Sequence, residues 1–210
     1  MNKKTITTPK GIAKYPHVNE PNTRFNAMGE YSCHIIVSDE DGNAFREKVE
    51  SIFDAEYERE CIIHKKKLKK SEHFPVLKDE DGQWLIKTKQ VAKVEAKSGD
   101  VYRFDVKLFD SSGSPVKAEN GNVGSGSEVK CSVEPRAWYN PSVGFGMTLS
   151  LRAVQVIELV EGGGGNADSF GFGQEDGFKA ETFDEALTDE EAGVEAERKG
   201  AVRRERVGLG

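Results

Sequence analysis

The amino-acid sequence predicts a mainly β protein, a small closed barrel with one inserted α-helix, followed by a disordered acidic tail. Three observations support this prediction. Short segments rich in β-branched residues alternate with Asp-Gly and Ser-Gly turn sequences. One amphipathic helical segment interrupts them near the N-terminus. Beyond the glycine run at 162–165 the chain has few aliphatic residues and dense charge, which is typical of disorder.

The first elements are a strand and a helix. A strand is predicted over 31–37, and it ends at an Asp-Gly turn at 39–42. A helix is expected from about 43 to 61, because apolar residues recur there at helical spacing and charges fill the opposite face. The basic stretch 64–70 then reads as a loop or a frayed helix end.

A hairpin and a final strand pair follow. An Asp-Gly turn at 79–82 opens a long strand over 83–95, which a Ser-Gly turn joins to a strand over 101–109. After a Gly/Ser/Asn-rich loop, strands are predicted over 128–134 and 147–159, with a loop between them. Strand patterning alone does not separate a barrel from a sandwich. The size, the single inserted helix and the final hairpin favour a barrel of the oligonucleotide-binding (OB) type.

Charge divides the chain into a predicted domain, 1–161, and a predicted Gly linker with acidic tail, 162–210. The domain carries 24 basic and 24 acidic residues, so its net charge is zero. Residues 162–197 hold 11 acidic residues and one Lys, a net of −10, and the last thirteen residues carry +4, which together give the chain's −6. A detached polyanion beside a cationic surface can compete with a nucleic-acid backbone. The pattern points to a binder of single-stranded nucleic acid.

Basic residues on the predicted hairpin form the first candidate DNA-binding surface. Period-two alternation places Lys87, Lys89, Arg103 and Lys107 on one face of the sheet, where they would neutralise phosphates. The alternative is an ordinary solvated outer face of a barrel. Further candidate cations lie elsewhere in the sequence: Lys3, Lys65, Lys66, Lys67, Lys130 and Arg136.

Two aromatic residues between prolines are candidates for stacking on bases. Trp138 and Tyr139 lie in the predicted loop after Arg136, and stacking on such rings contributes about 1–3 kcal/mol per base. Alternatively Trp138 plugs one end of the barrel, which leaves Tyr139 as the exposed partner.

The sequence does not indicate an enzyme, a metal site or a cofactor. A P-loop is absent from the sequence, and the Asp-Gly segments do not fit a calcium-binding loop. Cys61, His64 and His73 offer three possible zinc ligands without a fourth. A metal-dependent nuclease using Asp79 and Asp81 is a weak alternative, and magnesium-dependent cleavage would reveal it.

Cysteine content and the N-terminal sequence indicate the cellular compartment of the protein. Three widely spaced cysteines favour a reducing cytoplasm over a disulfide framework. The N-terminus lacks the apolar region of a signal peptide, and no stretch is apolar enough to cross a bilayer. We therefore expect a cytoplasmic protein that does not contact membranes.

The order of these segments resembles the single-stranded DNA-binding protein of short-tailed (podovirus-type) phages. The resemblance covers almost all of 1–161. Besides the long helix, it rests on short motifs in matching order: Gly11-Ile12-Ala13, Gly29-Glu30-Tyr31, Lys87-x-Lys89, Gly124-Ser125-Gly126-Ser127, Val133-Glu134-Pro135-x-x-Trp138, Val143-Gly144 and Ile157-Glu158-Leu159. It implies an OB barrel that coats single-stranded DNA during phage replication and recombination and promotes annealing.

The resemblance also implies roles for the tail. It implies docking on the phage DNA polymerase and helicase-primase, a homodimer, and competition with DNA for the barrel. This chain departs from the family at Arg136, where an aromatic residue is typical, and at its basic C-terminal end. We therefore place partner binding on an internal segment: Phe178, Phe183, Asp184, Glu185, Asp189, Glu190 and Glu191. The rival interpretation is a non-catalytic phage interaction or assembly protein whose tail only aids solubility.

Overall fold

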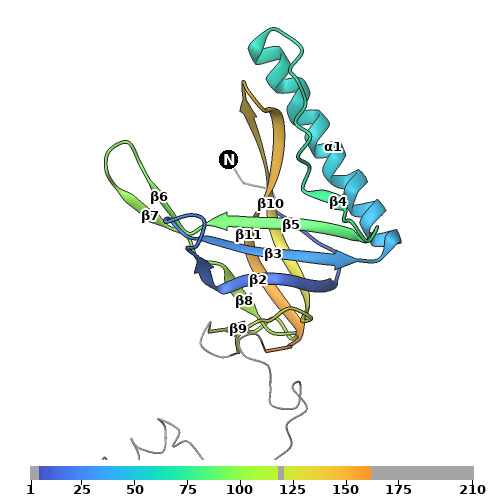
Figure 1. Ribbon diagram of the computed structural model, residues 1–210, viewed down its shortest axis with the longest axis vertical. Coiled ribbons are helices and arrows are strands. Elements are labelled where there is room, and N and C mark those ends of the chain that lie inside the picture. Colours follow the sequence, from blue (N-terminus) through green and yellow to red (C-terminus); the bar gives the residue numbers. More distant parts are fainter. Residues whose placement is uncertain (1–4, 118–120, 162–210) are drawn as a thin grey trace, which may run out of the picture. The chain divides into compact units, whose positions relative to one another are not determined.

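The protein is built around a closed β-barrel with one long helix beside it (Figure 1). The structure, a computed structural model, describes residues 5–117 and 121–161. The predicted tail and Lys3 lie outside the described residues, so the expectations placed on them stay predictions.

Five strands close the barrel. Their pairings run from β10 to β2, β3, β5 and β11 and back to β10, and every neighbouring pair is antiparallel except β5–β11, which is parallel. This order is that of an OB-type barrel, which confirms the predicted fold class. The five strands are β2 (Gly11–Asn22), β3 (Glu30–Val37), β5 (Trp84–Val91), β10 (Glu128–Asn140) and β11 (Gly144–Glu158).

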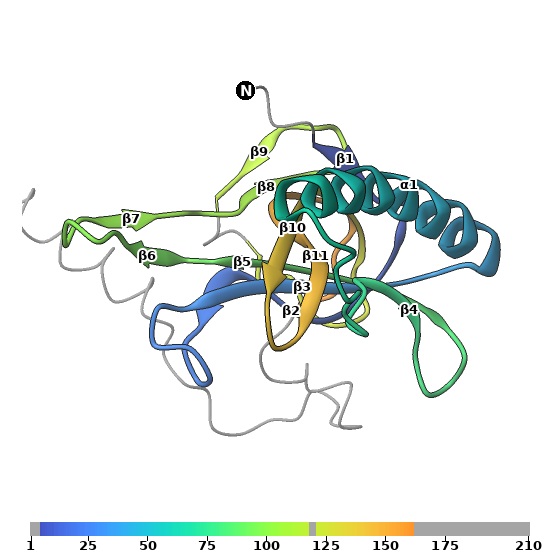
Figure 2. The same cartoon turned by 90° about the horizontal axis from the view of Figure 1, so that it is seen from above.

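Short strands extend this barrel. Three of them pair with barrel strands: β1 (Ile6–Thr7) with β10, β4 (Val76–Lys78) with β5, and β8 (Lys107–Phe109) with β11. A fourth, β9 (Pro115–Val116), pairs with β8. A separate hairpin consists of β6 (Lys93–Glu95) and β7 (Val101–Arg103). Figures 1 and 2 show this hairpin projecting away from the barrel.

Helix α1 (Asp39–His64) begins earlier than the sequence predicts. Ser38 is its N-cap and accepts a hydrogen bond from the backbone N–H of Asp41, and three acidic residues occupy the first turn. Carboxylates at this end interact favourably with the helix dipole. The expectation of an Asp-Gly turn at 39–42 was therefore wrong, because this segment is the first turn of the helix.

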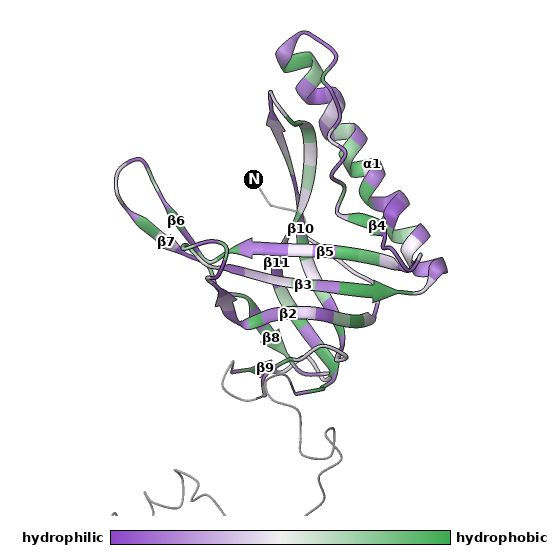
Figure 3. Ribbon diagram, viewed as in Figure 1, coloured by the Kyte–Doolittle hydropathy of each residue, from purple (hydrophilic) through white to green (hydrophobic). Residues whose placement is uncertain are grey.

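Gly42 lets the start of α1 lie directly against β5. A Cβ atom at Gly42 would lie 2.1 Å from Cγ of Trp84, so no other residue fits without moving the helix or the indole. Further along α1, Phe45, Val49 and Phe53 are buried in the core. Figure 3 shows that the ends of β3 and β5 nearest this helix are their more apolar ends.

The predicted hairpin is confirmed only next to its turn at 98–100, where β6 and β7 pair, and its predicted long strands are wrong. The strand expected over 83–95 divides at Ala92, whose backbone bonds to Gly29 and Phe104 turn the chain away from the barrel. Only β6 and β7 pair with each other, whereas β8 leaves them and joins β11. The loop predicted over 135–141 is instead the second half of β10 through Asn140, paired with β11 as far as Gly144.

Candidate nucleic-acid interface

The outer face of the barrel brings side chains from four strands onto one surface. The register aligns Lys14 of β2 with His34 of β3, and His34 with Lys87 of β5. Two residues further along β5, Lys89 pairs with Ser32 of β3 on one side and with Ser150 of β11 on the other. Strand alternation explains this placement, because the residues between them point into the core.

A groove of about 610 Å³ lies on this face. Two cations, Lys87 and Lys89, contribute to its wall. It also gathers five rings that come from distant parts of the chain: Phe25, His34, His73, Phe74 and Trp138. A groove that combines cations with aromatic rings suits a single strand, which presents both phosphates and unstacked bases.

Trp138 is held in a fixed position in this groove. Its ring lies on Gly146, where a Cβ atom would come within 2.2 Å of the indole Cζ2. Its Nε1 donates a hydrogen bond of 3.1 Å to Oγ1 of Thr148. A glycine beneath and a hydroxyl at the edge thus orient the indole before any ligand arrives.

Tyr139 points to the other side of β10. Its ring packs against the hydrophobic core and lies 4.8 Å from the ring of His64 at the end of α1. The expectation that Tyr139 is the exposed partner of a plugging Trp138 is corrected, because Trp138 lines the groove and Tyr139 does not. Their assignment to a loop concealed the strand alternation that separates them.

The cations of this face differ in their pairing. Lys89 lies 3.3 Å from a carboxylate oxygen of Glu30, and Lys14 lies 3.6 Å from one of Asp79. Within the described ranges, Lys87 forms no ion pair with a carboxylate. Lys87 is therefore the cation of the groove that is most available to a phosphate.

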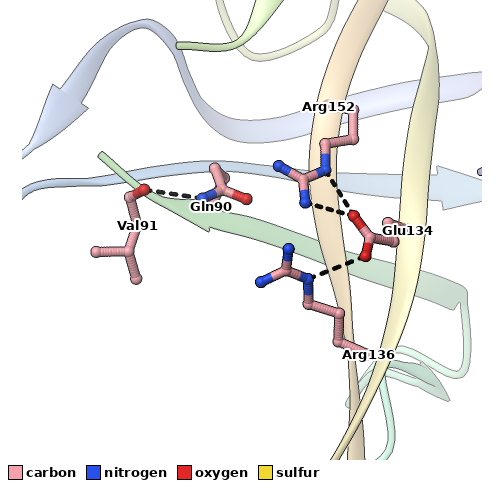
Figure 4. A network of polar contacts seen from close by, with 5 residues as sticks. All are labelled: Gln90, Val91, Glu134, Arg136 and Arg152. Carbon is pink, nitrogen blue, oxygen red and sulfur yellow. Dashed lines mark hydrogen bonds and ion pairs between the residues drawn. The ribbon is translucent and has the colours of Figure 1, made fainter. Parts of the chain in front are cut away.

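A buried carboxylate binds two arginines on the β10–β11 hairpin (Figure 4). Glu134 accepts hydrogen bonds from Nε of Arg136 at 3.3 Å and from Nε of Arg152 at 3.0 Å. Burial raises the pKa of Glu134, but the hydrogen bonds from Arg152 and Arg136 outweigh it, so the pKa lies below its ordinary value. Arg136, predicted as a DNA contact, is thus exposed but already paired with a carboxylate.

The remaining predicted cations lie outside the groove. Arg103 belongs to the projecting hairpin, and Lys107 lies on β8 opposite Ala153 of β11, so the four basic residues do not share one hairpin face. Lys130 lies further along β10, opposite Gln155. The division of the chain at Ala92 separates Arg103 from Lys87 and Lys89. DNA contacts at these outlying cations stay predictions.

The basic run after α1 also lies outside the groove. Lys65, Lys66 and Lys67 are exposed beyond the helix end, where Lys65 adopts a left-handed backbone conformation. The segment that follows them, 72–75, supplies part of the groove wall. The basic run that suggested a DNA contact therefore lies a few residues before the segment that lines the groove.

Sequence reasoning missed four of the groove's rings. Phe25 lies between β2 and β3, is 87% exposed, and has the guanidinium of Arg24 5.4 Å from its ring centre. A large aromatic residue among polar neighbours in a turn was the available signal. Phe74, His34 and His73 gave no comparable signal, because only the register and the path of the chain bring them to the groove.

Residues 5–117 and 121–161 contain neither a candidate metal-binding cluster nor a disulfide. No group of three His, Cys, Asp or Glu side chains in this part is placed to hold a metal ion. The three cysteines are free, and the hydrogen bond to Cys33, together with burial, raises the pKa of Cys131. No helix in the same ranges is both long and apolar enough to span a membrane.

Comparison with solved structures finds the same fold in phage proteins. The crystal structure of gp2.5, a single-stranded DNA-binding protein of bacteriophage T7, has 22% sequence identity and a TM-score of 0.66 over 85% of this chain and 100% of that one. The single-stranded DNA-binding protein of bacteriophage Enc34, solved in complex with single-stranded DNA, has 14% identity and a TM-score of 0.57. That alignment covers 78% of this chain and 91% of the Enc34 chain.

Comparison of sequences identifies the family. No curated protein matches the chain at a significant level. The family model described as single-stranded DNA-binding protein, bacteriophage T7, matches residues 8–159, which is more than half of the chain and includes the whole barrel. The chain therefore belongs to the family of the bacteriophage T7 single-stranded DNA-binding protein.

Proposed function

We propose that this chain binds single-stranded DNA without sequence preference in the groove on the outer face of the barrel. The observation that carries the proposal is the fixed indole of Trp138 in one groove with Lys87 and Lys89. The bases of a duplex already stack on one another, so an aromatic surface of this kind favours unpaired bases. The lysines would hold the backbone whatever the sequence.

Biological roles follow from membership of the family and the charge division of the chain. We infer that the protein coats single-stranded DNA in the cytoplasm of the host during phage replication and recombination, and that it promotes annealing without catalysing a reaction. The acidic segment 162–197 would compete with DNA for the barrel and dock on the phage DNA polymerase and helicase-primase. We further propose that the protein acts as a homodimer.

Replacing Trp138 tests the stacking role. Trp138→Leu should weaken binding of oligo-dT by roughly 5- to 150-fold, the equivalent of losing about 1–3 kcal/mol of base stacking. Intrinsic fluorescence provides a second readout, because Trp84 is buried against Gly42 whereas Trp138 lines the groove. Oligo-dT should quench the fluorescence of Trp84→Phe strongly and that of Trp138→Phe weakly. The reverse pattern would contradict the assignment.

Neutralising Lys87 tests the phosphate contact. Lys87→Gln should weaken binding and lower the slope of log K against log salt by about 0.7, the value for one phosphate on a single strand. Lys48→Gln, at an exposed position on α1 outside the groove, is the matched control and should retain the wild-type slope. If neither the wild type nor a variant binds DNA at low salt, the interaction or assembly interpretation replaces the proposal.

Removing the tail tests competition and docking. A chain that ends at Glu161 should bind oligo-dT more tightly than the full chain, with the largest difference at low salt, where repulsion between polyanions is least screened. It should also lose binding to the phage polymerase and helicase-primase in co-sedimentation, and its mass by sedimentation equilibrium would report whether dimers need the tail. Unchanged affinity for oligo-dT would rule out competition between the tail and DNA. Docking of the tail on its partners would still be decided by the co-sedimentation result.

A further inference from the structure

The imidazole of His34 lies in a row of basic residues across three strands. Its neighbour across β2 is Lys14 and its neighbour across β5 is Lys87. His34 and Lys87 both line the groove. A phosphate that approaches Lys87 therefore comes beside His34 as well.

Of the charged groups that shift the pKa of His34, two are positive and one is negative. Burial has the largest effect and lowers the pKa of His34, the positive charges of Lys87 and Lys14 lower it further, and Glu30 opposes them. Across the groove the loop before β4 contributes Glu72 and His73. Glu30 is already paired with Lys89, and Lys14 with Asp79, so Lys87 is the neighbour with no carboxylate beside it among the described residues. In the free protein His34 is thus neutral around neutral pH.

A bound phosphate would reverse this balance. It would offset the charge of Lys87, which disfavours a second cation nearby, and would itself accept a charge-assisted hydrogen bond from an imidazolium. We propose that His34 takes up a proton when single-stranded DNA binds, which gives the backbone a second cation beside Lys87 in the groove. This inference rests on the proposed function and adds to it a dependence on pH.

The direction in which DNA affinity changes with pH follows from the linkage between proton uptake and DNA binding. If the complex holds more protons than the separate molecules, lowering the pH favours the complex, and a full proton changes affinity by about tenfold per pH unit. The effect is confined to the window between the lowered pKa of the free protein and the higher pKa of the complex. Affinity should therefore rise as the pH falls through the pKa of His34 in the complex toward its lowered pKa in the free protein.

Two measurements on the full chain test the inference. Anisotropy titrations with oligo-dT at fixed salt give the slope of affinity against pH, and the thymine bases do not titrate in this range. Calorimetry in two buffers of different ionisation enthalpy counts the protons taken up. The wild type should gain roughly three- to tenfold in affinity per pH unit and take up a fraction of a proton or one proton. Its salt slope should also be steeper at about pH 6, by up to about 0.7.

Histidine variants locate the proton. His34→Gln keeps polar atoms but cannot become charged, so its affinity should no longer rise as pH falls and its proton uptake should vanish. His64→Gln is the control, because His64 packs on Tyr139 outside the groove, and it should retain the wild-type slope. His73→Gln removes the other groove imidazole, which lies outside the row, and should also retain the slope.

The outcomes separate this inference from the proposed function. Binding without proton uptake in the wild type would overturn the inference and leave DNA binding intact. Loss of the slope in His73→Gln but not in His34→Gln would assign the proton elsewhere and overturn it too. Absence of DNA binding at every pH would instead remove the proposed function on which it rests.

Discussion

The parallel pairing of β5 with β11 is the constraint on which the interface depends. It closes the barrel, and its register places Thr88 beside Leu149 and Lys89 beside Ser150. The first pair is buried in the core and the second pair lies on the opposite side of the sheet. A slip of one residue would exchange these faces, so core packing and the position of the lysines are fixed by the same contact.

The interface combines rigid rings with partly neutralised charge. Gly146 and Thr148 orient Trp138, so stacking on it requires little further ordering of the protein. Carboxylates pair with Lys89 and Lys14, whereas Lys87 keeps a free charge within the described part of the chain. Such a surface attracts a polyanion without being strongly cationic. This balance fits the zero net charge of residues 1–161.

Local sequence patterns predicted the elements better than their partners. The strand over 31–37 and most of α1 were predictable because alternation and helical spacing are local signals. The first turn of α1 was missed, since Gly42 there serves contact with Trp84 and not a turn. The pairing of β8 with β11 was also missed, because no local pattern reveals that the chain leaves the barrel at Ala92 and that β8 returns to pair with β11.

The candidate site was predicted only in part. Lys87, Lys89 and Trp138 were singled out because charge and aromaticity are visible in a sequence, and all three line the groove. Phe25 and His34 were not, because their positions follow from loop paths and from register between strands. A contact made by residues more than fifty positions apart, such as His34 beside Lys87, is a property of the fold.

Photocrosslinking would test the central claim most directly. Oligo-dT carrying single iodouracil substitutions would be irradiated with the full chain, and the crosslinked peptides identified by mass spectrometry. The account predicts crosslinks at Trp138, Phe74 or Phe25, the aromatic residues of the groove. Crosslinks confined to the β6–β7 hairpin or to the segment 65–67, with none in the groove, would contradict it.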